Sequence, residues 1–113
     1  MTRTDDTADR LAAEATAARA LLDGLQRDFT GIVDASANSN ADDEHDPEGS
    51  TIAFERSQVT AMIDQAERRL REIAAARARI DDDTYGLCEV CGEPIAAARL
   101  EARPTARTCV ACS

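Results

Sequence analysis

Cys88-Glu-Val-Cys91 and Cys109-Val-Ala-Cys112 are two short knuckles that contain all four cysteines of the chain. Seventeen residues separate the two pairs, and both lie in the last quarter of the sequence. Two Cys-x-x-Cys knuckles at this separation are typical of a zinc site in which four thiolates surround the ion. Gly92 suits the tight turn that follows the second cysteine. The spacing therefore predicts one zinc ion bound by Cys88, Cys91, Cys109 and Cys112.

Two disulfides or a redox pair are the alternatives for these cysteines. Disulfides belong to oxidising compartments, but the N-terminal Met1-Thr-Arg-Thr-Asp-Asp lacks the apolar run of a secretion signal. No stretch approaches the roughly 18 apolar residues of a membrane span. A thioredoxin-type site is disfavoured because nothing in the sequence resembles the βαβ setting that this motif needs. We therefore expect a cytoplasmic protein whose cysteines bind metal.

The predicted zinc ion has a structural role rather than a catalytic one. A catalytic zinc keeps one coordination position open, whereas four cysteines fill the tetrahedron. The chain has a single histidine and shows no G-x-S-x-G or phosphate-loop pattern. We therefore expect no enzymatic activity. The binding free energy of the ion, on the order of 10 kcal/mol or more in small fingers, then stabilises the folded finger.

The composition favours long helices over a compact globule. Of 113 residues, 23 are alanine, and there are only two Phe, one Tyr and no Trp. The formal net charge is −9 at pH 7. A chain this acidic is repelled by phosphate backbones and attracted to basic protein surfaces. We therefore expect a basic protein surface as the partner, and neither free nucleic acid nor a membrane.

Apolar residues recur in two segments with alternating steps of four and three, which is the spacing of a coiled-coil seam. The first run comprises Leu11, Ala15, Ala18, Leu22, Leu25, Phe29 and Ile32. The second run comprises Val59, Ile63, Ala66, Leu70, Ile73, Arg77 and Ile80, with the arginine as its one polar member. The two segments are therefore expected to be helices that bury these runs.

The segment between the two runs, from Ser36 to Gly49, is polar and rich in helix breakers, which indicates a turn. A short link favours antiparallel neighbours. The predicted fold is mainly α: an antiparallel two-helix coiled-coil hairpin over residues 1–83, with an acidic tip loop near 38–50, followed by a small C-terminal zinc finger with four cysteine ligands over 84–113. Folding the chain in this way sets Leu11 against Ile73. The alternative is two helices of a larger bundle, which would require oligomerisation.

The second helix is expected to begin at Asp46-Pro47-Glu48, because Asp is a good N-cap and Pro fits the first helical position. It is expected to end near Asp81. Three consecutive acids there oppose the helix dipole, and a flexible joint to the finger is one interpretation of them.

Acidic residues gather in the predicted tip loop. Such a cluster is consistent with a solvated loop, or with contact to a basic residue or a metal ion of a partner. The members are Asp42, Asp43, Glu44, Asp46 and Glu48. His45 lies among them and is expected to be solvated rather than a zinc ligand.

The finger sequence closely resembles the DksA/TraR family of C4-type zinc-finger proteins. The resemblance rests on the four cysteines, on Ile95, on the run Arg99-Leu-Glu-Ala-Arg-Pro-Thr105, and on the preceding Tyr85-Gly86. It implies a transcription factor that binds bacterial RNA polymerase through the secondary channel, without sequence-specific DNA binding. It also implies that the coiled-coil tip reaches toward the active-site Mg²⁺ and modulates initiation, in some members together with ppGpp.

Two features depart from the pattern of that family, the tip motif and the cations of the ppGpp site. The Asp-x-x-Asp-x-Ala tip of well-studied members is matched only by Asp46. The lysines of the family's ppGpp site correspond to Ser113 and Glu72, so only Arg103 matches and a ppGpp response is doubtful. Arg99 and Arg103 are expected either to contact a partner or to support the finger, and support is favoured for Arg99.

Two other functions remain open on sequence grounds. A GATA-like DNA-binding finger shares the cysteine spacing, but residues 84–113 have three Arg against three Glu and no basic tail. The other function is a zinc-stapled coiled-coil adaptor that binds some other basic protein. The composition fits this adaptor and a polymerase-binding factor equally well. Only the resemblance to the family separates these two.

Overall fold

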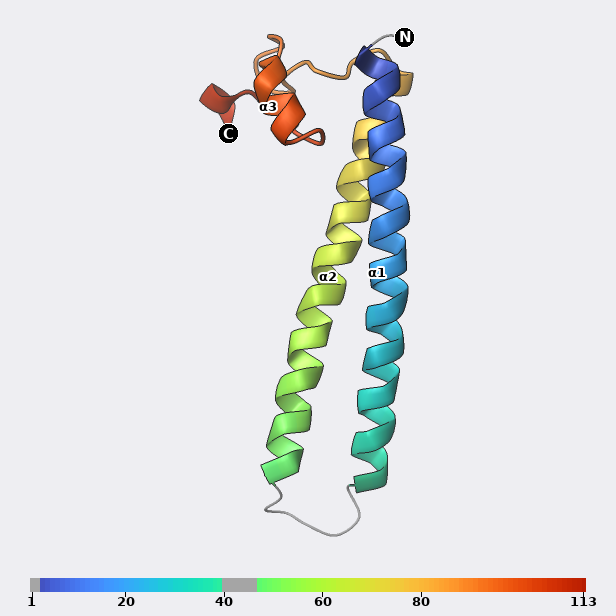
Figure 1. The fold of residues 1–113 in the computed structure, drawn as a ribbon. Helices are drawn as coiled ribbons and strands as arrows, with labels where there is room; N and C mark the ends of the chain where they lie inside the picture. Colours follow the sequence, from blue (N-terminus) through green and yellow to red (C-terminus); the bar gives the residue numbers. More distant parts are fainter. Residues whose placement is uncertain (1–2, 40–46) are drawn as a thin grey trace. The chain divides into compact units, whose positions relative to one another are not determined.

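The computed structural model describes residues 3–39 and 47–113, and within them it is helical apart from turns and one isolated bridge. Two long helices dominate, α1 (Arg3–Ser39) and α2 (Pro47–Asp81), and they form the predicted antiparallel hairpin (Figure 1). The C-terminal segment adds the short helix α3 (Ala97–Ala102) and the 3-10 turn η1 (Val110–Cys112). Within the described residues, no helix is long and apolar enough to cross a membrane.

The predicted seam is confirmed along α1. Leu11, Ala15, Ala18 and Leu25 are buried, and the other three members of the run are half-buried. In α2 the run from Val59 to Ile80 is likewise buried or half-buried, with one exception described below. The period of four and three therefore identified the apolar face of both helices.

Both helices extend into the region expected to be a loop near residues 38–50. Helix α1 ends at Ser39, and α2 begins at Pro47. Proline at the first helical position loses no hydrogen bond, because the first N–H groups of a helix lack an intrahelical partner. The predicted start of the second helix at Pro47 is therefore confirmed. The predicted N-cap, Asp46, lies outside the described residues.

The chain packs as two units, each with its own contacts. The finger unit consists of Met1–Thr16 and Arg69–Ser113, and the hairpin unit consists of Ala17–Arg68. The first turns of α1 and the last turns of α2 thus belong to the same unit as the cysteines. Whether residues 84–113 fold as a domain of their own stays a prediction.

The core of the finger unit is small and lies between α1 and α2. Leu11 and Ile73 are 0 % and 1 % exposed and belong to one cluster, so their predicted proximity is confirmed. Ala15 and Ala76 complete the buried cluster, and Tyr85 packs against it. Burying a large aliphatic side chain stabilises a fold by about 1.5–3 kcal/mol.

One seam position predicted from the heptad is wrong. Arg77 is exposed, and Ala76 occupies the core in its place with 0 % exposure. The step of three from Ile73 to Ala76 brings a small apolar side chain onto the α1-facing side. The guanidinium of Arg77 consequently avoids the desolvation that burial would impose.

Helix α2 ends in a hydrogen-bonded cap rather than a flexible joint. Asp83 adopts a left-handed backbone with φ 61°, and its N–H donates to the Ile80 carbonyl at 3.2 Å. The Thr84 N–H donates to the Arg79 carbonyl at 2.9 Å. These two bonds form a Schellman motif, which satisfies carbonyl groups at the helix end. Aspartate tolerates the left-handed region better than most residues with a Cβ.

Candidate metal centre

The first knuckle is held by backbone hydrogen bonds around Cys88. The Cys88 N–H donates to the Glu93 carbonyl at 2.8 Å, and the Gly92 N–H donates to the Cys88 carbonyl at 2.9 Å. Gly92 has φ 76°, so the turn predicted to need glycine does use the left-handed region. An isolated antiparallel bridge between Leu87 and Pro94 closes the loop. These contacts fold the chain back so that both knuckle sulfurs face the same side.

The second knuckle brings its two sulfurs to the same place. The Sγ atoms of all four cysteines lie within 4.8 Å of one another, and all four are free thiols. Four sulfurs about 2.3 Å from a common tetrahedral centre are about 3.8 Å apart. The Cys91 and Cys109 sulfurs are separated by 3.8 Å, far beyond a disulfide bond. The donor set and its spacing therefore fit a tetrahedral zinc ion, and not a disulfide.

The titration of the thiols also favours a cation at their centre. Hydrogen bonds from the backbone amides of Cys91 and Cys109 lower the pKa of the Cys88 thiol to about 6. The neighbouring thiols of Cys109 and Cys88 raise the pKa of Cys112 to about 12. One proton of the cluster is thus lost easily and another is retained, because neighbouring thiols share hydrogen bonds with the Cys112 sulfur. Four thiolates without a cation would repel one another. A divalent ion removes this repulsion.

The finger has a small interior and several polar contacts. Ile95, which the sequence singled out, is 5 % exposed. The Arg99 Nε donates to the Thr108 carbonyl at 2.9 Å, next to the second knuckle. The Arg107 guanidinium, whose Nη2 lies 2.9 Å from the Glu89 carboxylate, holds the pKa of that carboxyl below its usual range. Arg99 thus bonds within the finger, and its role as a support of the finger stays a prediction.

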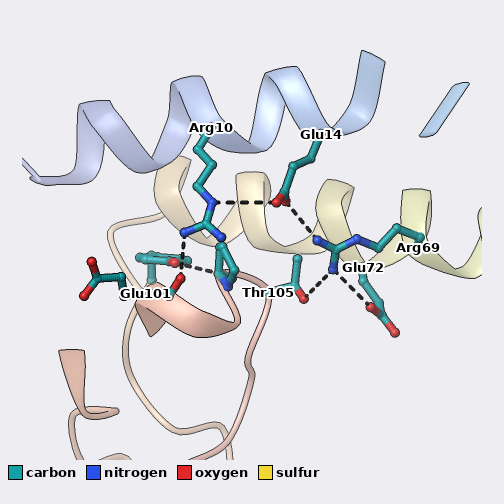
Figure 2. A network of polar contacts seen from close by, with 8 residues as sticks. Arg10, Glu14, Arg69, Glu72, Glu101 and Thr105 are labelled. Atoms are coloured by element: carbon teal, nitrogen blue, oxygen red, sulfur yellow. Dashed lines mark hydrogen bonds and ion pairs between the residues drawn. The ribbon is translucent and has the colours of Figure 1, made fainter. Parts of the chain in front are cut away.

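Side chains of α1, α2 and the finger meet in one polar network (Figure 2). Arg10 Nη1 donates to the Glu101 carbonyl at 2.7 Å, and its Nε lies 3.6 Å from the Glu14 carboxylate. Arg69 Nη2 lies 2.9 Å from the other Glu14 oxygen, and its Nη1 donates to the Thr105 hydroxyl at 3.2 Å. Glu14 therefore links two arginines, and each of them also donates a hydrogen bond to the finger.

Thr105 and Tyr85 anchor the same region from the finger side. Thr105 is 6 % exposed, and its hydroxyl accepts the hydrogen bond from Arg69 in a partly buried contact. The Tyr85 hydroxyl donates to the Pro104 carbonyl at 2.7 Å. Burial raises the pKa of Tyr85 above its ordinary value, although nearby Arg79 and Arg10 oppose the shift.

The structure does not test the predicted tip residues. Asp42, Asp43, Glu44 and Asp46 lie outside the described residues. Glu48 lies in the first turn of α2, and its side chain is also outside the description. Their role stays a prediction.

Arg103 follows α3 and is exposed. Within the described chain, its side chain makes no hydrogen bond or ion pair, so it differs from Arg99. The sequence did not identify Arg10, Glu14 or Arg69, because the contacts that join them to other elements span 36 to 91 residues. In the sequence, the run from Arg99 to Thr105 was the feature that pointed to this part of the finger.

Comparison with known proteins identifies the finger segment. Residues 83–112 match the family model described as "Prokaryotic dksA/traR C4-type zinc finger". Together with the four-cysteine cluster, this match supports zinc binding.

Similar curated proteins extend the likeness to the helices. The RNA polymerase-binding transcription factor DksA of Escherichia coli is 33% identical over 93 residues, which are 81% of this chain and 58% of that protein. DksA of Haemophilus influenzae is 43% identical over 49 residues, 43% of this chain and 34% of that protein. The uncharacterized protein YteA of Bacillus subtilis is 37% identical over 75 residues, 66% of this chain and 31% of that protein. The chain thus spans about a third to three-fifths of these relatives.

A solved structure agrees with the fold. The transcription factor DksA2 from Pseudomonas aeruginosa superposes with a TM-score of 0.79 at 25% identity, covering 96% of this chain and 78% of that one. The hairpin and the finger therefore share one arrangement of secondary structure with that protein.

Proposed function

Because the chain belongs to the DksA/TraR family of C4-type zinc-finger proteins, we propose that it is a transcription factor that binds bacterial RNA polymerase through the secondary channel. It modulates initiation without sequence-specific DNA binding and without catalysing a reaction. The observation that carries the proposal is the four-cysteine cluster joined to a two-helix hairpin, in a chain similar to proteins named RNA polymerase-binding factors.

The metal part of the proposal is one structural zinc ion held by Cys88, Cys91, Cys109 and Cys112. Four thiolates leave no open position for water or substrate, so the ion fixes the two knuckles and performs no chemistry. Its binding free energy adds to the folding free energy of a unit whose buried core is small.

The charge of the chain supports a basic protein partner, and the proposed compartment is the bacterial cytoplasm. At a formal net charge of −9, long-range attraction brings the chain to cationic surfaces and repels it from nucleic acid. In the proposed complex, the acidic residues from Asp42 to Glu48 approach basic groups or the Mg²⁺ of the polymerase active site. Carboxylate oxygens suit both partners.

The response to ppGpp is proposed to be weak or absent. A groove of about 400 Å³ beside the finger contains Arg99, Arg103 and Arg107, but also Glu72 and Glu89. Arg107 is paired with Glu89 at 2.9 Å, and the Arg99 Nε donates to a backbone carbonyl. Arg103 is thus the cation available to an anion there, and a polyphosphate requires more than one.

Co-purification with core RNA polymerase tests the proposal. We expect stoichiometric binding that a second secondary-channel factor, such as a Gre-type cleavage protein, displaces. Retention in the presence of that competitor would contradict secondary-channel binding and favour a zinc-stapled adaptor for another basic protein. Tight duplex binding with a steep salt dependence would instead favour the GATA-like DNA-binding finger.

The tip is tested separately from binding. Replacing Asp42, Asp43, Glu44 and Asp46 by their amides should leave polymerase binding intact and weaken the effect on initiation. A matched control replaces four exposed helix acids, Asp23, Asp28, Glu55 and Asp64, and gives the same change in net charge. Equal initiation kinetics in both variants would show that the tip acts only as a solvated loop.

A further inference from the structure

The finger unit contains a cavity of about 530 Å³ that neither the cysteine cluster nor the groove beside Arg103 includes. The first turns of α1 contribute Asp6 and Arg10 to its lining, and the finger contributes Tyr85, Leu100 and Glu101. Pockets that bind small molecules have volumes of about 300–1,000 Å³. The cavity is therefore large enough for a small organic ligand.

Much of the wall of the cavity is apolar. Ile95 is 5 % exposed, and Leu100 and Tyr85 are half-buried. The Leu100 Cδ1 would lie 3.6 Å from a Cβ placed on Gly86, an ordinary van der Waals contact, so the Leu100 side chain lies beside the Gly86 backbone. An apolar or aromatic ligand body would lose its contact with water here, which is the main driving force for such binding.

Two carboxylates at the cavity are available to a ligand. Within the part of the chain that the structure describes, the side chains of Asp6 and Glu101 make no hydrogen bond or ion pair, and both residues are exposed. Figure 2 shows the Glu101 side chain directed away from Arg10, which bonds to the Glu101 backbone instead.

The cation of the lining is already engaged. Arg10 lies 3.6 Å from the Glu14 carboxylate and donates to the Glu101 carbonyl at 2.7 Å. Its guanidinium is therefore already bonded, whereas the side chains of Asp6 and Glu101 are not. Two carboxylates and one guanidinium give the lining a net charge of −1. The cavity consequently favours a positively charged ligand over a negative one.

We propose that this cavity binds a small organic amine, with its apolar or aromatic body against Ile95, Leu100 and Tyr85 and its ammonium group between Asp6 and Glu101. The Tyr85 hydroxyl is fixed by its 2.7 Å bond to the Pro104 carbonyl, so the ring is held in place before a ligand arrives.

Three probes of nearly equal shape separate charge from apolar contact: 2-phenylethylamine, 2-phenylethanol and phenylacetate. Each is titrated into the zinc-loaded chain while the amide resonances of Gly86 and Leu100 are followed by NMR. Tyr85 is the chain's single tyrosine and there is no tryptophan, so intrinsic fluorescence reports the same site. We expect saturable binding in the order amine, alcohol, carboxylate. Each exposed carboxylate should contribute about a twofold to fivefold preference for the amine.

Two variants test the assignment. Asp6→Asn with Glu101→Gln should reduce amine affinity to that of the alcohol, whereas Asp9→Asn with Glu93→Gln, which removes the same charge outside the cavity, should change it little. Ala97→Leu fills the cavity and should weaken all three probes; zinc content and circular dichroism check its fold. Equal binding of phenylacetate and the amine, amide shifts at other residues, or no saturable shift would overturn the proposal.

Discussion

The carboxylate of Glu14 lies 2.9 Å from the Arg69 Nη2 across 55 residues of sequence, and it joins α1 to α2 within the finger unit. The same arginine continues to the Thr105 hydroxyl at 3.2 Å. The position of the finger on the helix ends thus depends on charged groups as well as on the apolar core.

Glu14→Gln should destabilise the finger unit by about 1 kcal/mol, because the two side chains are 29% and 37% exposed and water screens part of their attraction. Urea denaturation of the zinc-loaded chain measures the loss. The effect should shrink at high ionic strength, since the Debye length falls from about 10 Å at 0.1 M to about 3 Å at 1 M, which is close to the length of this contact. Glu67→Gln is the matched control, because Glu67 is also half-buried and forms no ion pair among the described residues. Equal losses in both variants would contradict a specific role for Glu14.

The hydrophobic period of the sequence predicted the fold well because it reports a local property. Leu11, Ala15, Leu25 and Ile73 all lie on the apolar face that steps of four and three assign to them. The cysteine spacing likewise predicted the cluster, since each knuckle needs only a few neighbouring residues to form. Both signals are repeated or short-range, so one sequence suffices to detect them.

Other features could not be read from the sequence. Ala76 is one of three consecutive alanines, so no contrast in side-chain type marks it as a core residue. The heptad assigned Arg77 instead, because a helix with 3.6 residues per turn drifts away from a strict 3.5-residue repeat. Asp83 caps α2 at a position where glycine is usual, which hid the cap. The bond from Arg10 to Glu101 joins residues 91 apart, and no local pattern marks such a pair.

Leu11→Ala should destabilise the chain by about 2–5 kcal/mol, because it removes a fully buried side chain and leaves a cavity in a small core. Leu21→Ala is the same substitution on the same helix at a side chain that is 54% exposed. This control should cost less than about 1 kcal/mol. Thermal and urea unfolding followed by circular dichroism compare the two. A loss of similar size in both variants would show that Leu11 is not a core residue.

Tyr85 should titrate above its ordinary pKa of 10.0, because burial disfavours the phenolate and the hydroxyl donates to Pro104. Since the folded state holds the phenolic proton more tightly than the unfolded state, the stabilisation is complete below pH 10 and is lost as the pH rises through the folded pKa. Tyrosinate absorbance measures this pKa directly, because the chain has one tyrosine. The same titration in denaturant supplies the reference. Tyr85→Phe should be less stable near neutral pH and should lose the alkaline decline of stability. A native pKa at or below the denatured value would refute the burial argument.

Removal of zinc should loosen more of the chain than the cysteine-containing segment. The first turns of α1 and the last turns of α2 belong to the finger unit, so they lose packing when the knuckles open. We expect hydrogen exchange to rise in residues 84–113 and also in 3–16 and 69–81 after chelation, while residues 17–39 and 47–68 keep their protection.

Cys88→Ser should produce the same pattern without a chelator, together with loss of stoichiometric zinc, because one of four thiolates is removed. Circular dichroism should still show a substantial helical signal from the hairpin unit, whose seam residues Ala18, Leu25 and Ala66 are buried independently of the cysteines. Restoring zinc to the chelated wild-type chain should restore protection in the finger unit. Loss of protection confined to residues 84–113 would show that the helix ends are stable without the finger. Loss along both helices together would show instead that the two units unfold as one.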